Sequence, residues 1–112
     1  MYYSYTVMGK TKLPLTIDDK TLFQELKSIM EELGQTFSYL QLVENLKYDA
    51  QAKGWFKKEP YTEYAQIEFT DDDLRKVTSF LWEKIWDHSL MLEFHQNEYV
   101  TRGQNDYLFS KI

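Results

Sequence analysis

Residues 62–95, with the sequence TEYAQIEFTDDDLRKVTSFLWEKIWDHSLMLEFH, decide the fold. Apolar and polar residues alternate along 62–69, which predicts a strand with one buried face. Thr70 and the three aspartates after it are typical of a helix start, so a helix is predicted over 71–88. A second strand is predicted over 89–95. The residues expected to face inward on these two strands are Ala65, Ile67, Phe69, Leu90, Leu92 and Phe94.

A helix is also predicted upstream, over 18–33. Its apolar residues recur at helical spacing, and either Thr16 or Asp18 supplies the N-cap. Gly34 follows as a natural stop, because glycine readily adopts the left-handed conformation that often ends a helix.

The stretch after Gly34 has two interpretations. Ser38 and Gln41 have the spacing of a capping box, which favours a helix over 38–53. The aromatic and β-branched residues of 36–43 also allow a strand there. Both interpretations stay open at the level of sequence.

The two ends of the chain predict further strands. Residues 2–8 are rich in tyrosine and β-branched residues and predict a strand, followed by a short return strand over 12–17. A turn around 102–105 is expected to lead into a last strand at 107–109.

Together these elements predict a single α+β domain over 1–112, with about three helices on one face of a small, mostly antiparallel sheet. If 36–43 is a strand, the order becomes ferredoxin-like βαββαβ with a C-terminal hairpin. Neither arrangement specifies a function.

Composition excludes several classes of protein. The chain has no cysteine, which removes thiol nucleophiles and thiolate zinc sites and favours a reducing, cytoplasmic location. Its first residues lack the pattern of a signal peptide, and no apolar run reaches membrane-spanning length. The net charge of −5 is the reverse of the basic excess expected of a nucleic-acid-binding protein.

Residues with catalytic or metal-binding chemistry do not converge on a site. His88, Glu93 and His95 are the only concentration of metal-capable types, but no helix or strand spacing brings His88 to the other two. We therefore expect a non-catalytic protein without a metal or a cofactor. His88 is explained by its place at a helix C-terminus, where its charge would be favourable.

A winged-helix-like, nucleic-acid-binding protein is the alternative hypothesis. The helix at 38–53 and the loop that follows it, up to residue 58, carry lysines interleaved with aromatic residues, as such a surface requires. The residues concerned are Lys47, Lys53, Trp55, Phe56, Lys57 and Lys58.

Aromatic residues make up 17% of the chain, and we expect that a core of this size does not bury all of them. On the helix at 71–88, Trp82 and Trp86 widen the apolar stripe beyond what one sheet contact needs. Tyr3 and Tyr5 share one face of the first strand. If they are not core, these four residues form a surface for another protein or for self-association, as in a regulator, an inhibitor or a subunit.

Overall fold

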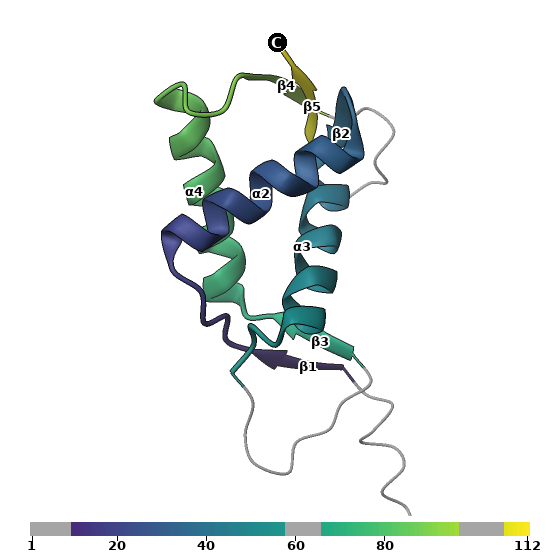
Figure 1. The fold of residues 1–112 in the computed structure, drawn as a ribbon, viewed down its shortest axis with the longest axis vertical. Coiled ribbons are helices and arrows are strands. Elements are labelled where there is room, and N and C mark those ends of the chain that lie inside the picture. The colour runs from purple at the N-terminus through teal and green to yellow at the C-terminus, as the bar shows by residue number, and fades with distance from the viewer. Residues whose placement is uncertain (1–9, 58–65, 97–106) are drawn as a thin grey trace, which may run out of the picture.

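The computed structural model describes residues 10–57, 66–96 and 107–112 (Figure 1). Within these ranges, three helices accompany a three-stranded antiparallel sheet and a parallel pair of strands, so the predicted α+β class is confirmed. The elements in chain order are β1 (Lys10–Leu13), α2 (Asp19–Leu33), β2 (Thr36–Ser38), α3 (Tyr39–Lys53), β3 (Gln66–Phe69), α4 (Asp71–Trp86), β4 (Leu92–Gln96) and β5 (Tyr107–Lys111).

The strands form two separate sheets. β1 pairs in parallel with β3, and β5 lies between β2 and β4 with antiparallel pairing on both sides. Figure 1 shows these sheets at opposite ends of α3. The ferredoxin-like alternative is therefore wrong, because it needs one sheet that contains all four of its strands.

The three-stranded sheet has an aromatic side and a polar side. Phe37, Phe109 and Phe94 lie in register across β2, β5 and β4, and the helices pack against this side. The opposite side carries exposed Thr36 and Glu93. This alternation is what a sheet covered on one face requires.

Each helix begins at a cap that the sequence predicted. The Thr21 N–H donates to Asp18 over 2.8 Å, and the Asp73 N–H donates to the Thr70 hydroxyl over 3.1 Å. At α3 the capping box is complete, because Gln41 N–H donates to Ser38 Oγ and the Ser38 N–H donates back to the Gln41 side chain. These bonds satisfy amide groups that have no partner inside the helix.

The two interpretations of 36–43 are both partly right. The strand β2 occupies 36–38, and Ser38 ends it because its side chain caps the helix α3 that starts at Tyr39. The C-terminal end of α3 also follows the prediction. Gly54 adopts the left-handed conformation with φ of 74°, which glycine accepts readily because it has no Cβ, and the Trp55 N–H donates to the Ala50 carbonyl.

Three predicted boundaries differ from the structure. The strand expected at 12–17 is β1, which stops before Pro14, a residue without an N–H for pairing. The helix expected to reach residue 88 ends at Trp86, and His88 turns the chain with a φ of 65°. The strand expected at 89–95 begins only at Leu92. The strand predicted at 2–8, the turn at 102–105 and Ala65 lie outside the described residues.

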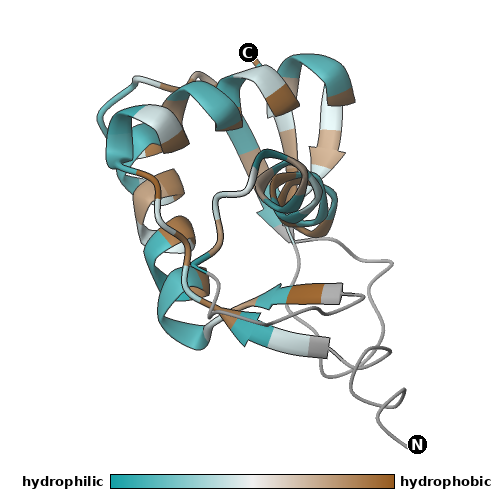
Figure 2. Ribbon diagram, turned by 60° about the horizontal axis from the view of Figure 1, so that its bottom comes forward, coloured by the Kyte–Doolittle hydropathy of each residue, from teal (hydrophilic) through white to brown (hydrophobic). Residues whose placement is uncertain are grey.

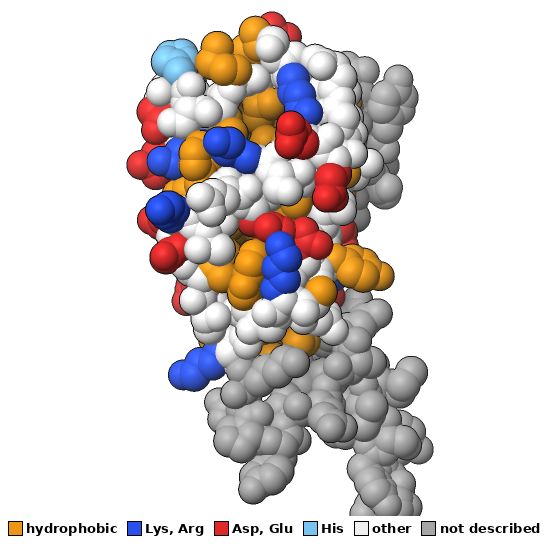
Figure 3. Space-filling model, in the orientation of Figure 1, with side chains coloured by type: hydrophobic (Ala, Val, Ile, Leu, Met, Phe, Trp, Pro, Cys, Tyr) orange, Lys and Arg blue, Asp and Glu red, His pale blue; other side chains and the backbone are white. Residues whose placement is uncertain are grey.

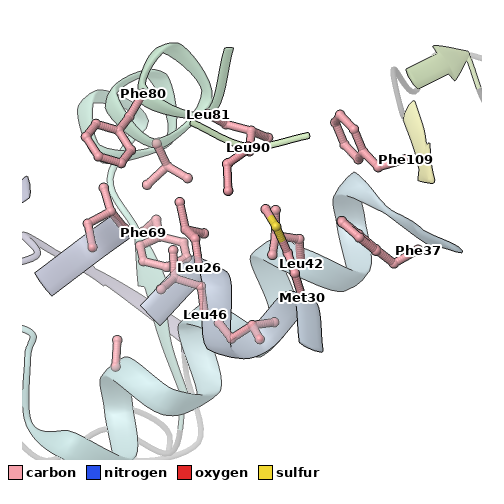
Figure 4. Packing of buried hydrophobic residues seen from close by; sticks show 14 of the residues in the cluster. Leu26, Met30, Phe37, Leu42, Leu46, Phe69, Phe80, Leu81, Leu90 and Phe109 are labelled. Carbon is pink, nitrogen blue, oxygen red and sulfur yellow. The ribbon is translucent and has the colours of Figure 1, made fainter. Parts of the chain in front are cut away.

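The buried side chains come from all three helices and both sheets and form a continuous cluster (Figure 4). Figure 2 shows the same pattern along α2 and α4, where hydrophobic and hydrophilic residues alternate. The largest side chains with almost no exposed surface are Leu22, Leu26, Ile29, Phe37, Leu42, Leu46, Val77, Leu81 and Phe109. Burial on this scale is the main stabilising term in a domain of this size.

Candidate functional site

An aromatic surface lies where the end of α4 meets the strand β4. We define the aromatic surface as Trp82, Trp86 and Phe94. Trp82 and Trp86 are one helical turn apart and hence neighbours on the helix surface. The Phe94 ring lies 4.4 Å from the Trp82 ring, centroid to centroid, in an edge-to-face arrangement. Trp82 and Phe94 are therefore in contact, and Trp86 lies next to Trp82 on the helix surface.

Trp82 is held in place by the three-stranded sheet. Its ring also lies 5.5 Å from Tyr107 and 5.9 Å from Phe109 on the neighbouring strand β5. The contact with Tyr107 is edge-to-face, a favourable arrangement for aromatic rings, and the contact with Phe109 is tilted. Trp82 is half-buried, so the sheet holds one part of the indole and solvent reaches the rest.

Trp86 is in a different situation although it lies only one turn further along α4. Its side chain is 74% exposed, and within the described ranges it makes no ring contact and no hydrogen bond. Phe94 is 42% exposed although the alternation of its strand predicted an inward side chain. It faces the helices as predicted, but it lies near the rim of the sheet, where the helix does not cover it fully.

Charged side chains flank the exposed tryptophan. Glu83 lies one turn before Trp86 and is exposed, and Asp87 follows Trp86 directly. Hydrogen bonding from the Ser89 side chain and from its N–H, which donates to the Asp87 carboxylate over 2.8 Å, lowers the pKa of Asp87, and the charge of Lys84 adds a smaller effect. The rim of the aromatic surface beside Trp86 is therefore acidic, apart from Lys84, which lies 3.9 Å from Asp87.

The second predicted pair, Tyr3 and Tyr5, lies outside the described residues. Its role as a partner-binding edge stays a prediction.

Two lysines of the alternative hypothesis, Lys47 and Lys53, are paired within the molecule. Lys47 contacts Glu44 and Glu68, each at 3.2 Å. Burial by itself would lower the pKa of Lys47, but the hydrogen bonds to these two carboxylates outweigh it and the pKa is raised. Lys53 pairs with Glu25 at 3.1 Å and lies over the Trp55 ring.

The rest of this segment offers little to a nucleic acid. Phe56 is buried and packs on Phe69, so it has no free ring face for stacking on a base. Lys57 is exposed, and Lys58 lies outside the described residues. Nothing in this arrangement favours the winged-helix hypothesis.

The metal-capable residues do not form a metal site in the part of the chain that the structure describes. His88, Glu93 and His95 are all exposed, and across the described ranges no three side chains of His, Asp or Glu are placed to hold one ion. Likewise, none of the helices described is long and apolar enough to cross a membrane.

The sequence did not predict the contribution of β5 to the site. Tyr107 and Phe109 reach Trp82 because β5 pairs with β4, and sequence spacing alone does not show that pairing. The one signal available was the run of aromatic residues at 107–109.

The arrangement of the aromatic surface can offer binding area but no reactive group. Searches with the chain against protein-family models, curated proteins and solved structures found no match.

Proposed function

We propose that this chain is a small, acidic, non-catalytic interaction domain that binds another protein through its aromatic surface. The observation that carries the proposal is the 74% exposure of Trp86, which lies one helical turn from the Trp82–Phe94 pair. Exposed tryptophans that adjoin partly buried aromatic residues are typical anchors of protein interfaces.

The support that Trp82 receives from the sheet makes this surface suitable for binding. Because the Trp82 ring already contacts Phe94, Tyr107 and Phe109, it loses little conformational freedom when a partner covers it. The acidic rim at Glu83 and Asp87 would orient a partner whose own rim is basic. A domain of this kind would act as a regulator, an inhibitor or a subunit.

The partner is either a second copy of the chain or a different protein. The two are separated by measuring molar mass with light scattering over a hundredfold range of protein concentration. A mass that rises from monomer to dimer, and does not rise in Trp86→Ala, identifies self-association.

For a different protein, the test is affinity capture from a native lysate of the source cells, with and without nuclease, read by mass spectrometry. The wild-type chain is compared with Trp86→Ala and with Tyr48→Ala. Tyr48 is a matched control because it is also 74% exposed but lies on α3, outside the aromatic surface. We expect Trp86→Ala to lose the partner and Tyr48→Ala to keep it.

Two results would contradict the proposal. One is a partner that both variants keep, since binding would then lie elsewhere. The other is recovery of material that disappears with nuclease, which would favour the nucleic-acid alternative. A circular-dichroism melt of each variant shows that its fold is intact before capture.

A further inference from the structure

A groove of about 480 Å³ runs between α2 and the segment that leads into β4. Its base is apolar, formed by Met30, Leu90 and Leu92, and the half-exposed Met91 extends this base outward. In Figure 3, orange side chains near the top of the molecule lie in a hollow with blue and red side chains beside it. The volume is within the range of small-molecule sites, and the groove is open on one side.

Lys111 enters this groove because of its register in the sheet. Leu92 is its partner across β4 and β5, and paired residues lie on the same side of a sheet. By alternation this is also the side of Phe94 and Phe109, which the helices cover. The last strand thus places a lysine on the apolar side of the sheet, at its end, where the groove opens.

The positive charge in the groove is not matched by the protein. Neither Lys111 nor Lys27, which lines the groove from α2, has a carboxylate within ion-pair distance in the ranges that the structure describes. The Lys27 ammonium lies 5.0 Å over the Phe23 ring instead. Glu31 is the one carboxylate along the groove wall, and it is exposed. Two lysines and one glutamate thus line the groove, in a chain whose net charge is −5.

We propose that this groove binds an amphiphilic carboxylate, a molecule with a short aliphatic or aromatic body and one carboxylate. The body covers Leu90, Leu92 and the exposed thioether of Met91, and the carboxylate lies between the ammonium groups of Lys111 and Lys27. Burial of the apolar body supplies the affinity, and the lysines select the sign of the headgroup. The groove shares no residue with the aromatic surface, so this proposal does not depend on the proposed function.

The test compares three ligands with the same eight-carbon chain, namely octanoate, octanol and octylammonium, titrated into the isotope-labelled wild-type protein at pH 7. Amide shifts in two-dimensional NMR spectra report both the site and the dissociation constant. We expect shifts at Ser89–Leu92 and Lys111, with octanoate bound about fivefold more tightly than octylammonium, as two weak surface ion pairs would give.

Substitution then assigns the selectivity to the lysines. Lys27→Gln combined with Lys111→Gln should remove the preference for octanoate and leave octanol binding unchanged. Lys57→Gln, at an exposed lysine with no ion pair in the described ranges, should leave the preference intact. Met91→Gln should lower the affinity for all three ligands by the same factor.

Three results would overturn the proposal. Equal affinity for the three ligands would show adventitious apolar contact only. Shifts centred on Trp86 would place the binding at the aromatic surface, and an equal loss of preference in Lys57→Gln would point to overall charge. The ligand series uses the wild-type protein, so it decides the question even if the double variant does not fold.

Discussion

The lysine-rich segment at 47–57 and the aromatic surface at the end of α4 are both candidate binding surfaces by residue type. They differ in how far their side chains are paired or covered within the fold. In the segment, distant residues supply partners for two of the three lysines, since Glu68 pairs with Lys47 and Glu25 with Lys53. Phe69 likewise covers Phe56. At the aromatic surface, within the described ranges, the neighbouring rings of the sheet contact Trp82 but not Trp86. Trp86, one turn further on, is left exposed.

This difference shows that residue type alone does not mark a binding surface. What decides is whether a distant segment of the chain brings a complementary group to the same place. Lysines that are paired within the fold contribute little counterion release, the main source of affinity for nucleic acids. An exposed indole with no such partner keeps most of its surface available for contact with another molecule.

The strongest test of this contrast is Phe56→Ala in the lysine-rich segment. Phe56 is 4% exposed, its ring lies 5.5 Å from Phe69, and its backbone bridges to Leu15. Loss of the ring should lower the free energy of unfolding by about 3–4 kcal/mol, because a cavity replaces a buried aromatic side chain. Urea denaturation measures the change, and Lys57→Gln is the neighbouring control at an exposed position. A loss below about 1 kcal/mol would mean that the segment is not anchored as described.

The second test compares the two tryptophans directly. Trp82→Ala should lower the free energy of unfolding by about 2–3 kcal/mol, less than full burial would give because the ring is half-buried. Trp86→Ala should change it by less than about 0.5 kcal/mol, since the side chain has no partner in the described ranges to lose. Both values come from urea denaturation of the two variants and wild type under one buffer. Similar losses of unfolding free energy in the two variants would show that Trp82 and Trp86 are held in the fold to the same extent.

The same contrast explains which features could be predicted from the sequence. Helix starts are local, because Asp18, Ser38 and Thr70 bond to amides within three residues of themselves. The sequence shows these residues directly, and all three caps are found in the structure. The buried stripes of the helices follow for the same reason, since their spacing is also local.

Sheet pairing and side-chain partners are not local. Nothing near Lys10 in the sequence shows that β1 pairs in parallel with a strand that begins at Gln66. Helical periodicity likewise places Trp82 and Trp86 on one edge of the same stripe. Among the described residues, the pairing of β5 with β4 brings aromatic rings against Trp82 but not against Trp86. The candidate site therefore could be named from the sequence, but its exposed part could not be distinguished from its anchored part.

The third test asks how fully the ion pair between Lys53 and Glu25 offsets the burial of the Glu25 carboxylate. Of the three tests, it has the smallest expected change in the free energy of unfolding. Glu25 is buried between α2 and α3, where it pairs with Lys53. Burial and the neighbouring carboxylate of Asp49 raise the pKa of Glu25, and Lys53 only partly opposes them. The folded protein therefore binds this proton more tightly than the unfolded chain does. The resulting stabilisation is fully present below the unfolded-state pKa and is lost as pH rises through the higher folded-state pKa.

Glu25→Gln removes this titration while keeping the shape of the side chain. The free energy of unfolding of wild type, measured relative to that of Glu25→Gln, should therefore increase as pH falls from 7 to 4. Urea denaturation at several pH values measures it, and Glu32→Gln, at an exposed glutamate on the same helix, controls for the change in net charge. A difference that stays constant over this range would show that Lys53 offsets the burial of Glu25 completely. The ion pair between Lys53 and Glu25 would then fully offset the cost of burying the carboxylate. This part of the lysine-rich segment would be completely paired within the fold, in contrast to the exposed Trp86.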